Sequence, residues 1–282
     1  MDRVTPQEIE ISYPAVSELR GQRFLVKYGG AAMEDAQTKH LVCSEVASLV
    51  SLGLSIVVVH GGGKEITRMI ERLGLSSHFI DGLRVTSDEA MLATEMVLSG
   101  SINGDLVSRI SREGAPAVGL SGRAAGLLQA KRLRSKRGED LGRTGEVAHS
   151  SPAAVEALLR AGLVPVVSPV GEADDGSALN LNADYAAAAL AGSTQAACCV
   201  FLTDVPGVKR DGVVLPKLTP RVVAELIESG VISGGMIPKV ECAVRALDAG
   251  CPRAVIAHAA KRLAITHGLL GTPGCGSTLT AS

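Results

Sequence analysis

The chain has 282 residues, of which 46% are hydrophobic and 20% charged, so it can bury a large core in one or two domains. The formal net charge of −1 implies no attraction to nucleic acid or anionic membranes, and an aromatic content of 2% without tryptophan argues against base stacking. No apolar run approaches the ~18 residues of a membrane-spanning helix, and the first residues do not resemble a signal peptide. Six scattered cysteines without a CxxC pair are typical of reduced thiols. We therefore expect a cytoplasmic globular protein.

The first twenty residues precede any convincing strand. Apolar side chains recur at helix-like spacing from residue 8 to 19, but Pro14 should kink or restart a helix there. The segment is either a frayed terminus or an arm that docks on another subunit.

The segment 23–28 predicts a strand that ends in a turn at Gly29 and Gly30. Lys27 lies at the end of this strand. A lysine in that position is seldom structural, because burying an ammonium group without a partner is costly.

A second strand and glycine turn follow. Four β-branched residues, 56–59, predict a strand buried on both faces, and three glycines, 61–63, then turn the chain into a helix over 65–73. Free backbone N–H groups and the helix dipole make this an anion-binding arrangement. Its spacing is neither that of a Walker A loop nor that of a dinucleotide fingerprint, and tight packing alone would also explain such a turn.

The rest of the chain alternates between strands and helices. An extended segment, 81–86, carries Arg84, and short strands around the basic run 131–137 suggest a hairpin outside the core sheet. The other predicted elements are helices at 88–98, 103–112, 152–161, 185–192, 220 onward and 240–249, and strands at 117–122, 164–168, 199–204 and, as the last core strand, 254–257. This order predicts an α/β protein with a mainly parallel sheet covered by helices.

Several polar residues attach to glycine turns. Asn180, Asn182 and Asp184 alternate and so share one face, and a third glycine pair, 234–235, precedes Lys239. Ligands of open α/β sheets bind beyond the carboxyl ends of the strands. Amides and ammonium groups without a nucleophile or a His/Asp pair suit phosphoryl transfer, which depends on positioning and charge neutralisation. The His and Cys residues lack zinc-ligand spacing.

Six segments in order resemble motifs of the amino-acid kinase family, whose fold is a three-layer sandwich with a central, mainly parallel sheet. They are Phe24–Met33, Val59–Gly63, Gly82–Thr86, Asn180–Asp184, Leu202–Val205 and Gly234–Lys239. Within the family they are most similar to members that phosphorylate the side-chain carboxylate of N-acetyl-L-glutamate in arginine biosynthesis. The resemblance implies ATP and Mg²⁺ as cofactors and an acidic small molecule as substrate.

The resemblance also implies roles for single residues. Lys27 and Lys239 would neutralise charge on the transferring phosphoryl group, Asp184 would hold both lysines, and Gly30 and Gly62 would donate backbone N–H groups.

On the acceptor side, Arg84 and Asn180 would grip the α-carboxylate, beside Gly61, Gly63 and Asn182. On the nucleotide side, the resemblance points to Gly29, Thr203, Asp204, Gly207 and Met236 with the two lysines, and to no protein ligand for Mg²⁺. The acceptor carboxylate is ionised at pH 7, so no general base is required.

The chain departs from the family pattern at four places. Arg123 and Ala124 replace a usual Lys-Asp pair, Lys64 a common proline, and Gly104 a common lysine, while the tail 258–274 matches poorly. Two alternatives follow: the same chemistry on an aminoadipate-type or carrier-bound acceptor, or a regulatory relative that binds nucleotide or metabolite without catalysis.

The resemblance also suggests how the chain is divided into lobes and how its subunits assemble. We expect an arm at 1–20, an acceptor-binding and dimerisation lobe at 21–177 and a nucleotide-binding lobe at 178–282. The arm resembles a kinked helix that links dimers into a hexamer in arginine-sensitive relatives, so we expect a homohexamer, or a dimer as the fallback. Because the tail has lost the pattern, we expect weak or absent inhibition by arginine.

Overall fold

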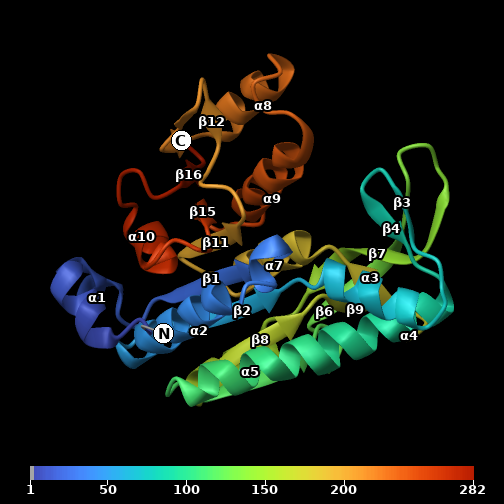
Figure 1. Cartoon of the computed structure of the whole chain (residues 1–282), viewed down its shortest axis with the longest axis horizontal. Helices are drawn as coiled ribbons and strands as arrows, with labels where there is room; N and C mark the ends of the chain where they lie inside the picture. Colours follow the sequence, from blue (N-terminus) through green and yellow to red (C-terminus); the bar gives the residue numbers. More distant parts are fainter. Residues whose placement is uncertain (1–2) are drawn as a thin grey trace.

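The protein is an α/β sandwich in the computed structural model, which describes residues 3–282 (Figure 1). Its main sheet has eight strands in the order β14 (Lys217–Leu218), β16 (Ser277–Thr280), β15 (Arg253–His258), β11 (Cys198–Thr203), β1 (Arg23–Tyr28), β2 (Ser55–His60), β8 (Val164–Ser168) and β5 (Ala117–Ser121). The strands β14 and β16 run antiparallel to the other six, which are all parallel. The predicted three-layer fold is confirmed.

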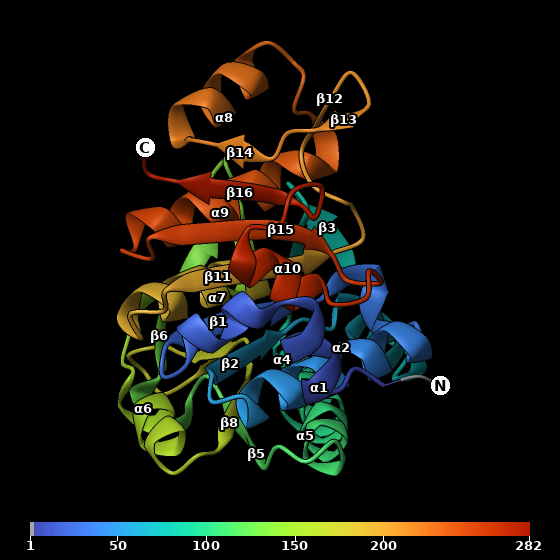
Figure 2. The same ribbon diagram turned by 90° about the vertical axis from the view of Figure 1, so that its left-hand side faces the viewer.

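Helices cover both faces of this sheet (Figure 2). One face packs against α2 (Ala36–Ser51), α5 (Asn103–Arg112) and α10 (Ala264–Leu270), and the other against α6 (Ala153–Arg160), α7 (Ala183–Ser193) and α9 (Ile237–Asp248). Side chains of a strand alternate between the two faces. Phe24, Val26 and Tyr28 of β1 therefore join the first core, whereas Leu25 joins the second. Lys27 follows Leu25 by two positions and points to the face that α7 covers.

Three helices and a β-hairpin follow the glycine turn of β2. The turn leads into α3 (Gly63–Arg72), then the hairpin β3 (His78–Ile80) and β4 (Leu83–Val85), then α4 (Asp88–Glu95), which Ser87 caps by accepting from the Ala90 N–H at 3.2 Å. Met96–Ile102 is π-helical and joins α4 to α5 without a break. Such wide turns are rare and often lie at functional sites.

Four strands form a small barrel beside the main sheet: β6 (Leu128–Arg134), β7 (Asp140–Ser150), β9 (Val170–Glu172) and β10 (Ala178–Leu181). The predicted hairpin around the basic run is confirmed as β6 and β7. The strand β10 pairs with β7 and β9, and the main sheet runs through both predicted lobes without a break. The division into two lobes at residue 177 therefore stays a prediction.

The carboxyl-terminal part adds a hairpin, β12 (Lys209–Arg210) and β13 (Val213–Val214), and α8 (Pro220–Glu228) before α9. The prediction that the strand near 254–257 is the last core strand is wrong. β16 follows it and pairs with it antiparallel. The short β16 has a single apolar residue, Leu279, and lacks the apolar run of the other core strands, which is why the sequence did not indicate it.

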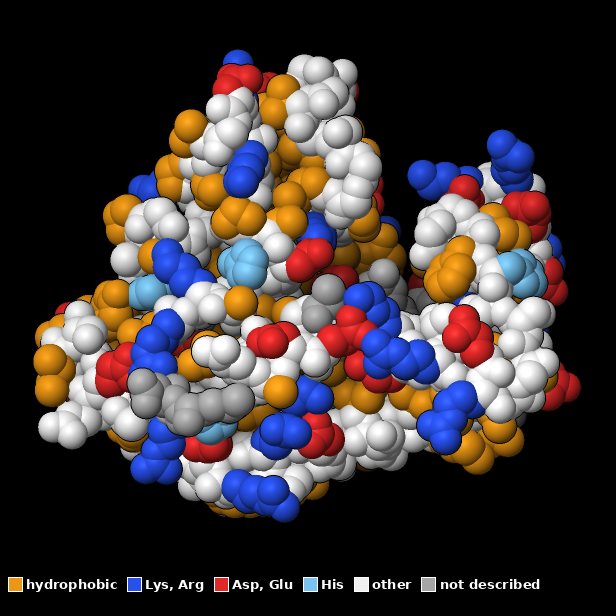
Figure 3. All heavy atoms as spheres, in the orientation of Figure 1, with side chains coloured by type: hydrophobic (Ala, Val, Ile, Leu, Met, Phe, Trp, Pro, Cys, Tyr) orange, Lys and Arg blue, Asp and Glu red, His pale blue; other side chains and the backbone are white. Residues whose placement is uncertain are grey.

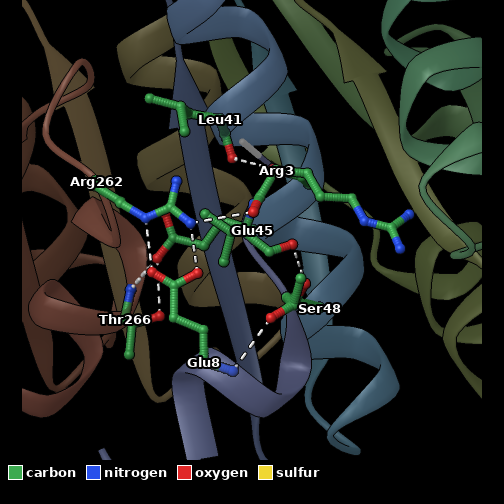
Figure 4. Close-up of polar contacts among 10 residues, drawn as sticks. Arg3, Glu8, Leu41, Glu45, Ser48, Arg262 and Thr266 are labelled. Carbon is green, nitrogen blue, oxygen red and sulfur yellow. Dashed lines mark hydrogen bonds and ion pairs between the residues drawn. The ribbon is translucent and has the colours of Figure 1, made fainter. Parts of the chain in front are cut away.

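The first residues pack against their own subunit. α1 (Pro6–Ser12) and the 3₁₀ turn Pro14–Leu19 bury Ile9 and Val16 in the core that α2 and α10 line. The Arg262 guanidinium bonds both oxygens of Glu8, at 2.6 and 2.5 Å (Figure 4). The expectation of a frayed terminus is therefore wrong for residues 3–20, and part of the apolar surface of the arm is covered within its own subunit.

Next to this contact, Glu45 of α2 is 2% exposed and accepts hydrogen bonds from the N–H and hydroxyl groups of Thr266, at 2.7 and 2.8 Å (Figure 4). Burial raises the pKa of its carboxyl group to about 7. Among residues 3–282, none of the helices is long and apolar enough to cross a membrane.

Candidate active site

Lys27 forms the innermost ion pair of the candidate site. Its ammonium lies 2.8 Å from the Asp184 carboxylate, and the residue is 7% exposed. The pairing meets the requirement that a buried charge has a partner. A Cβ atom on Gly29 would stand 2.6 Å from Lys27 Nζ, so the missing side chain at 29 leaves room for the ammonium group.

Asp184 reaches Lys27 from the first turn of α7. Asn182 is the N-cap of that helix, and its side-chain oxygen accepts from the N–H groups of Asp184 and Tyr185 at 2.8 and 3.2 Å. The predicted alternation therefore stops at Leu181, where β10 ends. Asn182 still lines the site but uses its oxygen for capping.

The two glycine turns meet beyond the ends of β1 and β2. The Gly61 N–H donates to the Tyr28 carbonyl at 2.9 Å, and α3 starts at Gly63 with its N-terminus facing the site. A Cβ atom on Gly62 would lie 2.3 Å from Ile102 and 2.8 Å from Leu98, so the turn packs directly on the π-helical segment. The exposed amides and the helix dipole together favour an anion here.

Arg84 of β4 is 6% exposed and lies over the same turn. Its guanidinium donates to the Gly63 carbonyl at 3.1 Å, to the Thr67 hydroxyl at 2.8 Å and to Ser77, and it stacks on Phe79 at 4.7 Å. Burial lowers the pKa of the guanidinium, which nevertheless stays charged. A buried cation held in this way can bind a carboxylate with two parallel hydrogen bonds.

These groups enclose one pocket of about 280 Å³. The predicted residues that line it are Gly30, Gly61, Gly62, Gly63, Arg84, Asn180, Asn182 and Asp184. Phe79, Leu83, Leu98 and Thr144 are among its other lining residues and were not predicted. The pocket thus joins phosphate-type turns to a buried arginine within one enclosure.

Asn180 belongs to a polar cluster that the sequence did not reveal. Its amide donates to the Thr86 hydroxyl at 3.3 Å, and the hydroxyls of Thr86 and Thr144 lie 2.9 Å apart. The Thr144 hydroxyl also donates to the Arg84 carbonyl. Only the pairing of β10 with β7 brings Asn180 opposite Thr144, so no local pattern could indicate this contact.

Lys239 does not share Asp184 with Lys27. It pairs with Asp204 at 2.7 Å, and this hydrogen bond lowers the pKa of the Asp204 carboxyl. The expectation that Asp184 holds both lysines is therefore wrong for this conformation. Lys239 lies in the first turn of α9 and Asp204 directly follows β11, so both remain at the carboxyl edge of the sheet.

Two of the predicted nucleotide residues, Gly207 and Met236, line a second pocket of about 240 Å³ beside this ion pair. Pro206, Lys209, Ile232 and Ser233 are among its other residues. Thr203 is 5% exposed, and its hydroxyl donates to the Val205 carbonyl at 3.0 Å. Thr203 therefore shapes the turn at the end of β11 and is not among the residues that line the pocket.

A larger hollow, of about 860 Å³, lies between α7, α8, α9 and β7. The face in Figure 3 is hollowed between the part that carries α8 and the part that carries the hairpins β3–β4 and β6–β7. This space lies apart from the glycine turns, which are not among its lining residues.

Three departures from the family pattern lie outside the pocket with Arg84. Lys64 pairs with Glu34 on the surface, and Gly104 is exposed on α5. Arg123 pairs with Glu95 at 2.9 Å and Glu172 at 3.2 Å. The pocket wall therefore keeps the family's residues at the positions that the resemblance assigns.

No cluster of three or more His, Cys, Asp or Glu side chains suited to a metal occurs within residues 3–282. The carboxylates nearest the site, Asp184 and Asp204, are each engaged by a lysine. Mg²⁺ commonly keeps water and substrate phosphates as ligands and needs only one or two protein carboxylates. The donor set thus fits a magnesium ion held mainly by a nucleotide.

Comparisons with known proteins agree with this geometry. The sequence pattern of the amino acid kinase family matches residues 22–258. A curated protein named acetylglutamate kinase from Novosphingobium aromaticivorans is 38% identical over 95% of this chain and 93% of its own, and one from Heliobacterium modesticaldum is 44% identical over 84% of both chains. The solved structure of N-acetylglutamate synthase from Neisseria gonorrhoeae with coenzyme A and N-acetyl-glutamate has the same fold, with a TM-score of 0.83 at 24% identity. The match covers 95% of this chain and 62% of the synthase chain. This chain therefore belongs to the amino acid kinase family.

Proposed function

We propose that this protein transfers the γ-phosphoryl group of ATP to the side-chain carboxylate of N-acetyl-L-glutamate, a step of arginine biosynthesis. The observation that carries the proposal is the single pocket in which the glycine turns and Asp184, the partner of Lys27, face Arg84 and Asn180. The curated relatives named acetylglutamate kinase support the choice of acceptor.

The acceptor binds through its α-carboxylate. Arg84 holds the α-carboxylate, and the amide of Asn180 lies beside it in the pocket wall. This orientation directs the side-chain carboxylate toward Gly30 and Gly62. The reaction then depends on holding the two substrates in line, which is the main contribution of proteins to phosphoryl transfer.

One carboxylate oxygen of the acceptor attacks the γ-phosphorus, and the bond from this phosphorus to the β–γ bridging oxygen breaks. ADP leaves with that oxygen, and the product is an acyl phosphate. No proton moves, because the acceptor is already ionised at pH 7. The N–H groups of Gly30 and Gly62 and the Lys27 ammonium stabilise negative charge on the equatorial oxygens.

Lys239 acts from the nucleotide side. In the conformation described here its ammonium is held by Asp204, which is half exposed. Phosphates of ATP, placed beside the pocket that contains Gly207 and Met236, offer Lys239 a stronger partner than a solvated carboxylate. The lysine then moves to the phosphate chain. Magnesium, held mainly by phosphates and water, supplies further charge neutralisation.

Two other functions agree less well with the structure. An aminoadipate-type or carrier-bound acceptor would require a changed acceptor pocket, but Lys64, Gly104 and Arg123 are not among the residues that line it. A non-catalytic regulator would have little need of two lysines and an aspartate that serve a transition state, and this chain retains all three.

Trapping with hydroxylamine tests the proposal, because hydroxylamine converts an acyl phosphate to a hydroxamate. ATP-dependent hydroxamate should form with N-acetyl-L-glutamate at a kcat/KM well above those for free glutamate, aspartate and N-acetylaminoadipate. A clear preference for N-acetylaminoadipate would support the first alternative. The absence of hydroxamate with every acceptor, despite nucleotide binding, would support the second.

We also propose that the subunits assemble, as a hexamer or at least a dimer. The arm presents Ile11, which is 72% exposed, although Ile9 and Val16 are buried within the subunit. Ile11→Glu should convert hexamers to active dimers in light scattering, and Leu73→Glu, at an exposed aliphatic residue outside the arm, should not. Dimers in the unmodified protein would contradict the hexamer.

A further inference from the structure

His60, at the end of β2, is fully buried and takes no part in the reaction described above. Its Nδ1 lies 2.9 Å from the Gly61 carbonyl oxygen, and its Nε2 lies 3.1 Å from the side-chain nitrogen of Asn103. The same Asn103 nitrogen lies 2.9 Å from the Val166 carbonyl oxygen. A chain of three hydrogen bonds thus runs from β8 through the first residue of α5 to the glycine turn.

These contacts fix the position of the imidazole proton. The Val166 carbonyl can only accept, so the Asn103 atom beside it is the NH₂ group, which donates there and to His60 Nε2. Nε2 must then be the acceptor and carries no proton. The proton of the neutral ring is on Nδ1 and is donated to the Gly61 carbonyl. Burial lowers the pKa of His60 to about 4, so the ring is neutral at pH 7.

The fixed carbonyl determines where the next N–H group points. In a planar trans peptide the C=O and N–H bonds point in opposite directions. Because the Gly61 carbonyl is held toward His60, the Gly62 N–H points away from the ring, and Gly62 itself lines the pocket. Within the described part of the chain, no carbonyl or side chain accepts a hydrogen bond from this N–H. The side chains of Leu98 and Ile102 pack against Gly62 and restrict its movement.

We propose that His60 and Asn103 are positioning residues of the phosphoryl site. Asn103 selects the tautomer of His60 with its proton on Nδ1, and His60 holds the Gly61–Gly62 peptide with its N–H turned to the transferring phosphoryl group. This inference rests on the proposed function, because it requires a phosphoryl group at Gly62. It assigns a task to the π-helical segment, which brings Asn103 to His60 and Ile102 to Gly62.

Two substitutions of one residue separate positioning from packing. In His60→Asn the side-chain NH₂ stands near the former Nδ1 and can still donate to the Gly61 carbonyl, whereas in His60→Gln the amide reaches only the position of Nε2. Both remove the ring and should lower thermal stability to a similar extent. His60→Asn should keep kcat within about threefold, and His60→Gln should lower it by on the order of 10-fold or more with little change in the acceptor KM.

A binding measurement without turnover gives the same ranking. ADP with aluminium fluoride and N-acetyl-L-glutamate mimics the transferring phosphoryl group. In titration calorimetry, its affinity should fall in His60→Gln and not in His60→Asn, with ADP alone unchanged in both. Equal losses in the two variants would mean that His60 only fills space, and would overturn the proposal.

Nitrogen-15 NMR of the histidine side chains in the full chain tests the tautomer itself, and the His60→Asn spectrum assigns the signal. We expect the proton on Nδ1, and no titration between pH 6 and 9. A proton on Nε2, or protonation near pH 6.5, would overturn the inference. A wild-type protein that forms no acyl phosphate would overturn the proposed function instead, while the tautomer and the binding of ADP with aluminium fluoride would still decide the role of His60.

Discussion

Gly29→Ala tests how closely the chain positions the ammonium group of Lys27. The new Cβ atom would lie 2.6 Å from Lys27 Nζ and 2.9 Å from its Cε, where ordinary contact begins at 3.4 Å. The ammonium must therefore retreat by about 0.8 Å, which disturbs its 2.8 Å pairing with Asp184. A misplacement of about 1 Å in a reacting group can cost on the order of 10²-fold in rate.

We therefore expect kcat to fall by on the order of 10- to 10²-fold, while the free energy of unfolding changes by about 0.5 kcal/mol or less, because the end of a lysine side chain can move. Initial rates of hydroxamate formation and thermal unfolding measure the two effects. Gly104→Ala is the matched control, since position 104 is exposed on α5 with open space around it. An unchanged kcat in Gly29→Ala, or a kcat loss matched by unfolding, would refute the reasoning.

The other predictions concern charge, recognition and stability. Lys239→Ala should lower kcat by on the order of 10²-fold or more, and a rise in KM alone would show that Lys239 only binds substrate. Arg84→Gln should raise the KM of the acceptor much more than that of ATP, because it removes a bidentate carboxylate partner; equal rises would place Arg84 elsewhere. Gly104→Ala should stabilise α5 by up to about 1 kcal/mol in chemical denaturation, because glycine is a poor helix former; a loss of stability would contradict this. With a Glu45 pKa of about 7 in the folded chain and 4.5 as the reference, the folded state holds a proton that the unfolded chain releases, so stability falls as the pH rises through this window. Glu45→Gln should therefore increase the free energy of unfolding at pH 8 by at most about 3 kcal/mol, seen as a higher Tm, and leave Tm unchanged at pH 4. Equal Tm values at pH 8 would contradict the pKa.

The sequence predicts secondary structure best where the pattern within one element is sufficient to identify it. The four β-branched residues before Gly61 and the amphipathic helix after Gly63 predict β2 and α3 with their turn, because burial on both faces demands a continuous apolar run. The residue type also indicates Lys27, since an ammonium at the end of such a strand needs a partner.

Contacts between distant elements could not be predicted in this way. The pairing of Lys239 with Asp204 instead of Asp184 depends on how α9 sits against β11. The role of Asn182 was missed because the alternation of polar residues at 180, 182 and 184 resembles a strand, whereas asparagine at 182 is the N-cap of a helix. His60 and Asn103 are 43 residues apart, and the π-helical turns that bring them together leave no sequence pattern.

Transfer of an oxygen label tests the central claim most directly. N-acetyl-L-glutamate labelled with ¹⁸O in its side-chain carboxylate is incubated with ATP and the protein, and the product is cleaved with hydroxylamine. Hydroxylamine attacks the acyl carbon, so the bridging oxygen leaves with the phosphate. If the carboxylate attacks phosphorus, the released phosphate carries one ¹⁸O atom, and Lys27→Ala releases far less of it. Phosphate without the label would show that ATP is hydrolysed or that another atom is phosphorylated, and would contradict the account.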